Sequence, residues 1–318
     1  MATNGIKFGT THKIKQIGRM DLPGGGLVTV EKGYAYVGHI DPPYGTSIVD
    51  VRDPKKPKLV SQLEVPDGIH SHKVRVSGDV MLVNYERFQT KKEPQGGLKI
   101  FDISDKSKPR EIAFFKTADK GVHRFTFDGS YAYLSPTLEG YVGNIVMILD
   151  LKEPTRPEEV GRWWMPGQWT AGGETPSWHG TDHRCHHPIR RGDRLYVSYW
   201  HAGFVILDIS DMSKPKLVSH LDWSPPYPCP THTTLPMAKK ILDRDVMVVT
   251  DEEVGEKLAP KPNAFFWVVD ITDETRPIPI STYMIPYDGE SAPGKRFGAH
   301  QPAEQVYDTI LYVTWFAA

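Results

Sequence analysis

The segment Ile206-Leu-Asp-Ile-Ser-Asp-Met-Ser-Lys-Pro215 decides the fold, because close copies of it recur along this 318-residue chain. In each copy an apolar run ends at an aspartate, and a proline follows seven residues later. The pairs are Asp50 with Pro57, Asp102 with Pro109, Asp150 with Pro157, Asp208 with Pro215 and Asp270 with Pro277. The aspartates lie 48 to 62 residues apart. Repeats of this length, made of short β-runs, are typical of radial or stacked β-architectures.

The second copy shows how one unit is built. Its strand-like segments are His72–Ser77, Val80–Tyr85, Leu98–Ile103 and Arg110–Phe115. β-Branched and aromatic residues fill them, and Gly, Asp and Pro lie between them, as in strands joined by hairpin turns. We expect the repeated aspartate to end the third strand and cap the next turn, and the proline to preset the turn into the outer strand.

Four strands in about 45 residues correspond to one propeller blade. We therefore predict an all-β fold, a single β-propeller domain over residues 1–318 with six or seven four-stranded blades. The blade-like units are expected at about 23–66, 70–117, 121–165, 183–224, 230–286 and 296–318. The last unit stops before its third strand, so we expect an incomplete last blade and a chain that is a fragment. Residues 13–20 read as a lone outer strand that completes the last blade.

The net charge of −1 argues against a nucleic-acid partner or an anionic membrane surface. The N-terminal segment has no apolar signal core, and no run approaches the roughly 20 apolar residues of a membrane span. Cys185 and Cys229 provide no disulfide framework. These features favour a cytoplasmic protein without membrane or nucleic-acid partners, and they indicate no particular oligomeric state.

Histidines recur at one position of the repeat. Three of them lie six residues before the first turn glycine of their unit: His72 before Gly78, His123 before Gly129 and His186 before Gly192. His232 and His300 open the first strands of the fifth and sixth units, and Leu27 takes the position in the first. First strands line the central channel of a propeller, so these five imidazoles are expected to converge around the axis.

Imidazole is the commonest neutral metal ligand, and three or four around an axis suit a transition metal. We expect iron or copper first, and zinc or manganese next. Three or four of His72, His123, His186, His232 and His300 are expected to bind, while the others contact the ligands or the substrate. The first blade has no histidine, and this side is the expected open one. A histidine at a strand end is more commonly a hydrogen-bonded structural residue, and this remains the alternative.

Other residues are expected around the metal. Acidic residues follow the second strands (Glu86, Glu139, Asp251, Glu252 and Glu253), and of these Glu86, Glu139 and Glu253 are the candidates to orient a ligand. His187, His201, Trp178 and Trp200 are candidates for substrate contacts or support of the ligands. Adjacent strand residues face opposite ways, so only His186 of the His186-His187 pair should reach the axis. The insertion over residues 163–182 is either an aromatic lid over the channel or an ordinary packed loop.

The Ile-Leu-Asp-Ile-Ser-Asp units, together with strands such as Gly192-Asp-Arg-Leu-Tyr-Val-Ser198, resemble LVIVD-repeat β-propeller proteins over about residues 13–318. This resemblance implies the fold and no activity, because the family is functionally diverse. The histidine set is similar in concept to the carotenoid cleavage oxygenases, whose propeller holds iron by four histidines. It is also similar to the selenium-binding protein and methanethiol oxidase group, histidine-rich propellers with copper. Both are analogies at the level of the fold.

The leading hypothesis is a transition-metal oxidoreductase or oxygenase that acts on a small aromatic or apolar substrate. A zinc- or manganese-dependent hydrolase or lyase is the second enzyme class. The rival is a non-catalytic propeller that serves as a binding or scaffold module, in which the histidines are structural. A calcium lactonase of the propeller type is disfavoured, because calcium prefers oxygen ligands.

Overall fold

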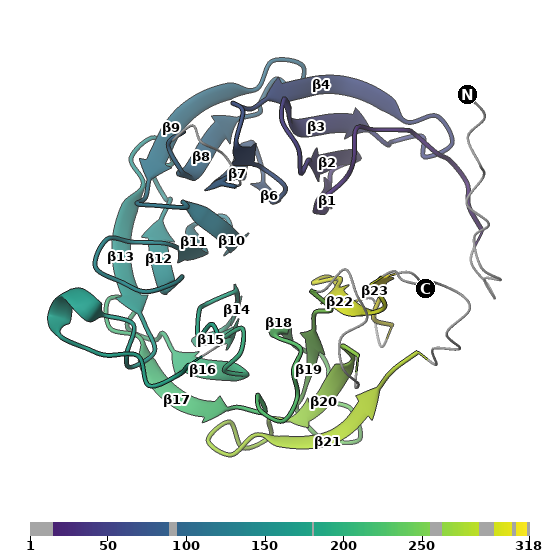
Figure 1. Ribbon diagram of the computed structural model, residues 1–318. Helices are drawn as coiled ribbons and strands as arrows, with labels where there is room; N and C mark the ends of the chain where they lie inside the picture. Colours follow the sequence, from purple (N-terminus) through teal and green to yellow (C-terminus); the bar gives the residue numbers. More distant parts are fainter. Residues whose placement is uncertain are drawn as a thin grey trace.

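The computed structural model of this protein describes residues 15–88, 94–179, 181–254, 263–285, 296–306 and 310–316. In these ranges the chain forms 23 β-strands and one short 3-10 helix, η1 (Thr170–Gly172). The strands are grouped in six antiparallel sheets that follow one another around a common axis (Figure 1). The predicted all-β propeller fold is therefore confirmed.

Each sheet is one blade, whose strands run outward from the axis in chain order (Figure 1). Blade one contains β1 (Val28–Glu31), β2 (Tyr34–Gly38), β3 (Tyr44–Asp50) and β4 (Lys58–Glu64). Blade two contains a divided first strand, β5 (Ile69–His70) and β6 (Val74–Ser77), then β7 (Val80–Arg87), β8 (Gly97–Asp102) and β9 (Arg110–Lys116). Blade three contains β10 (Val122–Phe127), β11 (Tyr131–Pro136), β12 (Val146–Asp150) and β13 (Glu158–Trp163).

The remaining blades continue around the ring. Blade four contains β14 (His187–Arg191), β15 (Arg194–Ser198), β16 (Phe204–Asp208) and β17 (Lys216–Leu221). Blade five contains β18 (Thr231–Pro236), β19 (Val246–Asp251), β20 (Phe266–Asp270) and β21 (Ile278–Tyr283). The described part of blade six contains β22 (Gly298–Pro302) and β23 (Val313–Phe316).

The apolar core lies between neighbouring blades, because each sheet packs face to face on the next. The isoleucine two residues before the repeated aspartate is fully buried in four blades: Ile48, Ile100, Ile148 and Ile206. Burying one such side chain stabilises a fold by about 1.5–3 kcal/mol. In blades one to four the repeat therefore encodes a core anchor at the same place in the third strand.

The repeated aspartates cap the turn after the third strand, as predicted. In blades one to five the backbone N–H two residues later donates to the aspartate Oδ1, with nitrogen–oxygen distances of 2.8 to 3.0 Å. The donors are Arg52, Ser104, Lys152, Ser210 and Thr272. The recurrence of this local bond explains why the aspartate is repeated, so it is structural and not catalytic.

The inner strands are irregular where the histidines lie. His72 falls in the break between β5 and β6. The pairing of β10 with β11 shifts register across His123, and that of β18 with β19 shifts across His232. A bulge sets two consecutive residues against one on the partner strand, so the simple alternation of faces is lost. At these positions two neighbouring side chains can therefore approach the axis.

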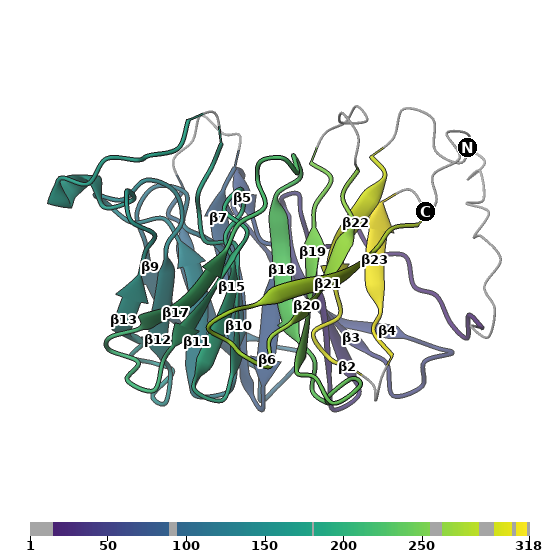
Figure 2. The ribbon, with the colours of Figure 1, turned by 90° about the horizontal axis from the view of Figure 1, so that it is seen from below.

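Two expectations about the periphery need correction. Residues 15–20 form no strand, and Gly18 lies against the backbone of Pro54, so the described part of the 13–20 segment does not complete a blade. Residues 13 and 14 lie outside the described ranges. The η1 turn of the 163–182 insertion lies at the outer edge of the ring and does not cover the axis (Figures 1 and 2). Trp178, later in this insertion, lines the cavity discussed below.

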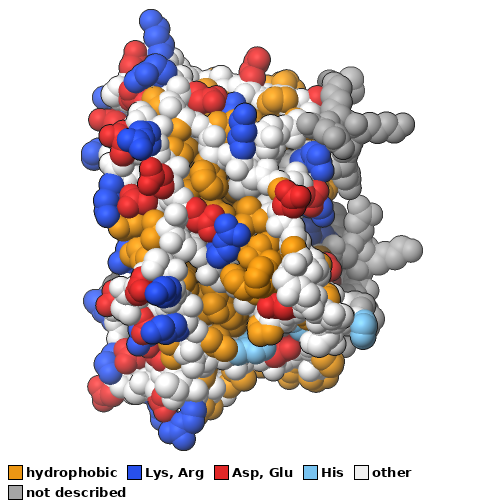
Figure 3. Space-filling model, turned by 90° about the vertical axis from the view of Figure 1, so that its left-hand side faces the viewer, with side chains coloured by type: hydrophobic (Ala, Val, Ile, Leu, Met, Phe, Trp, Pro, Cys, Tyr) orange, Lys and Arg blue, Asp and Glu red, His pale blue; other side chains and the backbone are white. Residues whose placement is uncertain are grey.

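The outer surface carries charges of both signs. Figure 3 shows one side of the molecule, where lysine and arginine side chains are interspersed with aspartate and glutamate. Among the residues that the structure describes, no helix is long and apolar enough to cross a bilayer.

Candidate metal centre

The structure brings the five histidines together in one arc around the axis. Neighbouring ring centroids lie 5.9 Å apart for His72 and His123, and 4.8 Å apart for His123 and His186. They lie 4.4 Å apart for His186 and His232, and 4.3 Å apart for His232 and His300. These residues come from five different blades, so the repeat position used in the sequence analysis does correspond to one place in space.

The hydrogen bonds fix which nitrogen of His123 and His186 carries the proton. His123 Nδ1 lies 2.8 Å from both oxygens of Glu86, and a carboxylate only accepts, so Nδ1 is the donor. His186 Nδ1 donates to the carbonyl oxygen of His232 at 2.7 Å. In the neutral rings both Nε2 atoms are therefore unprotonated. These two atoms face each other at 3.0 Å.

A glycine allows Glu86 to reach His123. Gly121 has φ +93°, and a Cβ at this position would lie 2.3 Å from the carbonyl oxygen of Tyr85. Any other residue would be strained and would push the two segments apart. Because of this close approach, Glu86 and Gly121 form an antiparallel β-bridge. The residues just before β10 therefore lie against the end of β7. Backbone packing thus places the carboxylate under the imidazole.

Two groups of potential metal ligands lie along the arc, each with two imidazoles and one carboxylate within 4.8 Å of one another. The first contains His70, His72 and Glu86. Here His70 Nε2 and His72 Nδ1 are buried and make no hydrogen bond with a described residue. His70 stacks on His72 with ring centroids 4.2 Å apart. These two nitrogens are therefore free to bind an ion.

The second group contains His186, His232 and Glu252, and its atoms are more heavily engaged. Arg124 Nη2 donates to His232 Nε2 at 3.0 Å, and Arg296 Nη2 donates to Glu252 Oε1 at 2.9 Å. The Nε2 atom of His300 lies 3.7 Å from the same Oε1 of Glu252. A metal ion at this end of the arc would compete with two guanidinium groups, so the His72–His123–His186 end fits an ion better.

Arg124 lies beside the histidines and is deeply buried, with 2% of its surface exposed. Its Nη2 also donates to Gln301 Oε1 at 2.8 Å, while Nε and Nη1 have no hydrogen-bond partner among the described residues. Burial, with Arg75 nearby, lowers the pKa of Arg124 to about 10, so the group remains charged at neutral pH. A fixed positive charge therefore lies just below the imidazoles.

Burial lowers the pKa of every histidine in the arc. It lowers the pKa of His123 to about 4 and that of His300 to about 2. The pKa values of His72, His186 and His232 also lie well below the ordinary value, with burial as the main cause. For Glu86, burial works to raise the pKa, but the adjacent His123 outweighs it and the net shift is downward. The imidazoles are therefore neutral and the carboxylate is ionised, which are the protonation states that metal binding requires.

The expectation that only His186 of the His186-His187 pair turns inward is wrong. His186 contacts His123, while His187 Nδ1 lies 3.1 Å from Thr233 Oγ1 in the next blade, and its Nε2 lies 3.1 Å from Glu304 Oε1. Both side chains are buried. His186 precedes β14 instead of lying within its ladder, so the alternation of that strand does not apply to the pair. His187 thus belongs to a second polar layer below the histidine arc, with Arg124, Thr233 and Gln301.

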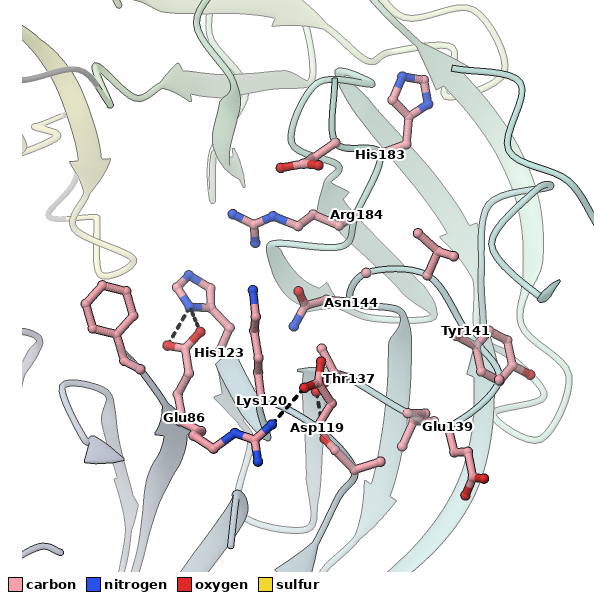
Figure 4. A pocket seen from close by; sticks show the side chains of 18 of the residues that line it. Glu86, Asp119, Lys120, His123, Thr137, Glu139, Tyr141, Asn144, His183 and Arg184 are labelled. Atoms are coloured by element: carbon pink, nitrogen blue, oxygen red, sulfur yellow. Dashed lines mark hydrogen bonds and ion pairs between the residues drawn. The ribbon is translucent and has the colours of Figure 1, made fainter. Parts of the chain in front are cut away.

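A cavity of about 950 Å³ lies beside the first group of ligands. The sequence-predicted residues His123, Glu86, Glu139 and Trp178 line it, together with His70, Phe88, Lys120 and Arg184. Figure 4 shows Glu86 bonded to His123 on one side and the Arg184 side chain extending toward them from the other. Residues of blades two and three and of the segment before blade four line this cavity.

The other predicted residues lie outside the cavity lining. Trp200 is buried and packs against His186, with ring centroids 4.7 Å apart. His201 Nδ1 accepts a hydrogen bond from the backbone N–H of Asp182 at 3.2 Å. Glu253 is buried, with an oxygen 3.8 Å from Cys229 Sγ. Its neighbour Glu252, and not the predicted Glu253, lies beside His232 and His300.

Sequence reasoning missed His70, Lys73, Arg124 and Arg184. Lys73 and Arg124 directly follow the repeated histidines, as do His187, Thr233 and Gln301. The position after the histidine therefore also recurs in the repeat. Its residues differ in charge and type, so the sequence alone does not indicate that they lie near one another. Arg184 has no counterpart in the other blades, so no repeat signal marks it.

The comparisons with known proteins agree with this architecture. The LVIVD repeat family matches residues 26–65, 94–117 and 191–222. No curated protein matches the chain in sequence. The periplasmic gluconolactonase PpgL of Pseudomonas aeruginosa is similar in structure, with a TM-score of 0.57 and 13% identity, over 85% of this chain and 76% of that chain.

A chain in the structure of S. cerevisiae Dbp5 bound to Nup159, Gle1, IP6 and ADP is similar with a TM-score of 0.51 and 9% identity, over 96% of this chain and 76% of that chain. At such identities the likeness concerns the fold alone. The predicted resemblance is confirmed by the three family matches: the chain is a β-propeller in which three segments match the LVIVD repeat.

Proposed function

We propose that this chain is a metalloenzyme that holds a transition-metal ion on the propeller axis, with His123 and His186 as ligands through Nε2 and His72 as a further ligand through Nδ1. The observation that carries the proposal is the 3.0 Å approach of two unprotonated Nε2 atoms. Lone pairs at this separation repel each other unless a cation lies between them. Nitrogens that each lie about 2.0–2.1 Å from one metal ion are about 3.0–3.4 Å apart, so the spacing suits ligation.

A proton shared between the two rings is the rival account of the same contact. It would require one imidazole to be charged in a buried region that also holds Lys73, Arg124 and Arg184. If a metal ion is bound, the hydrogen bond from His123 Nδ1 to Glu86 has a further role. Carboxylates that accept from the remote nitrogen of a ligating histidine fix its tautomer and orientation.

The donor set supports iron as the first metal and copper as the second. The proposed ligands are three imidazoles, and imidazole nitrogen suits iron and copper among the transition metals. Such an ion with an open position supplies redox chemistry with dioxygen or polarises a substrate oxygen. The adjoining cavity, with Phe88 and Trp178 in its lining, suits a small aromatic or apolar substrate. Three imidazoles also suit zinc, so a zinc-dependent hydrolase or lyase is the second candidate.

Elemental analysis of protein purified without an affinity tag tests the proposal. We expect close to one equivalent of a transition metal, and loss of that metal in His123→Ala and His186→Ala with the fold retained by circular dichroism. His179→Ala is the matched control, because His179 is exposed in the insertion and should leave the metal content unchanged. Absence of metal after reconstitution with Fe(II), Cu(II) and Zn(II), with His123 found protonated by NMR, would establish the shared proton and a non-catalytic module.

A further inference from the structure

Arg184 is a positively charged side chain without an acidic partner among the described residues. It lines the cavity, and its guanidinium lies over the ring of Trp200 at 4.1 Å from the centroid. It makes no hydrogen bond or ion pair with any residue in the described ranges. In Figure 4 its guanidinium extends into the cavity toward His123 and Glu86. Stacking on Trp200 holds the planar group in place and leaves its N–H donors facing the open space.

The charges beside the histidines are unbalanced. Three carboxylates there already have partners: Glu86 accepts from His123, Glu252 from Arg296 and Glu304 from Arg75. The buried Arg124 forms no ion pair with a described acid and contacts neutral groups instead. Unpaired buried charges are costly, so this region of the molecule favours a negative group brought by a ligand.

We infer that the substrate of this cavity is a small organic monocarboxylate with an apolar body, whose carboxylate is bound by the guanidinium of Arg184. The inference rests on the proposed function in that it takes this cavity as the substrate site. A planar guanidinium presents paired N–H donors that match the two oxygens of a carboxylate. Asp119, Glu139 and Asp182 also line the cavity and would repel a ligand with several negative charges. Phe88, which is 49% exposed, and Trp178 provide apolar surface for the rest of the molecule.

Binding of benzoate and of its neutral isostere benzamide tests the inference by calorimetry, on protein freed of metal with a chelator. We expect benzoate to bind at least tenfold more tightly than benzamide. Arg184→Gln should weaken benzoate by about 10- to 100-fold, the range of a charge-assisted pair of hydrogen bonds, and leave benzamide unchanged. Arg184→Lys should recover little of this loss, because an ammonium lacks the paired donors.

Lys120→Gln is the matched control, because Lys120 lines the same cavity but is exposed. It should change benzoate affinity by less than about threefold. The inference is overturned if benzoate does not bind, if Arg184→Gln leaves its affinity unchanged, or if Lys120→Gln weakens it equally. The metal-free format separates the two proposals. Arginine-dependent binding without a metal in the native protein would contradict the metalloenzyme and retain the anion site, and the reverse result would do the opposite.

Discussion

Replacing Glu86 with glutamine tests the orienting role of this carboxylate most directly. In the wild-type protein His123 Nδ1 lies 2.8 Å from both carboxylate oxygens of Glu86. The substitution preserves the side-chain volume and retains one oxygen that can accept a hydrogen bond from this nitrogen. A hydrogen bond to a charged group contributes about 1.5–3 kcal/mol and a neutral one about 0.5–1.5 kcal/mol. The difference is about 1–1.5 kcal/mol, and 1.4 kcal/mol corresponds to a factor of ten in affinity. We therefore expect Glu86→Gln to weaken metal binding about tenfold.

The assay is a titration of the metal-free protein with Zn(II) or Co(II) in competition with a chromophoric chelator. Glu139→Gln is the control, because it removes the same charge from the same cavity at an exposed residue away from the histidines. This control should change the dissociation constant by less than about twofold. Equal effects of the two substitutions would show that only the overall charge matters. An unchanged metal affinity in Glu86→Gln would refute the orienting role. A loss of affinity far beyond about 100-fold would indicate that Glu86 itself binds the metal.

Three further predictions concern the scaffold. Gly121→Ala should weaken metal binding while the β-rich circular dichroism spectrum is retained, because its Cβ would lie 2.3 Å from a carbonyl oxygen and displace the start of β10. Asp102→Asn should lower the melting temperature at pH 7, because hydrogen bonds from Ser104 and Arg110 lower the pKa of Asp102 from 3.8 to about 2. The difference from wild type should disappear as the pH falls from about 4 to about 2, where the wild-type carboxylate is protonated; a constant difference would contradict this reasoning. Ile148→Ala should reduce the free energy of unfolding in urea by about 2–5 kcal/mol, while Ile278→Ala, at a residue 57% exposed, should change it little; equal losses would show that the repeat isoleucine is no core anchor.

The parts of the fold that sequence could predict are those encoded by local chemistry. The aspartate of each repeat caps a turn within two residues, so its role depends on nothing distant. The repeat period then implies the ring, and the ring implies that equivalent residues such as His123 and His232 meet near the axis. These steps need only the spacing of residues and the symmetry of a propeller.

The finer details of the site depend on irregularities that the sequence does not mark. The register shifts at His123 and His232 change which neighbours turn inward, and nothing in the residue types announces them. The choice between Glu252 and Glu253 depends in the same way on a strand end. Arg124 was missed because a buried guanidinium is rare, and its burial depends on partners from other blades, His232 and Gln301.

The arc takes one histidine from each of blades two to six, and this has a consequence for how the protein matures. No hairpin, single blade or pair of adjacent blades contains the whole arc, so a partly formed ring could bind an ion only with an incomplete set of donors. Cations captured before the ring is assembled would be held weakly and exchanged. Tight retention would begin only when distant segments have docked, and metal occupancy would then report that folding has reached its final step.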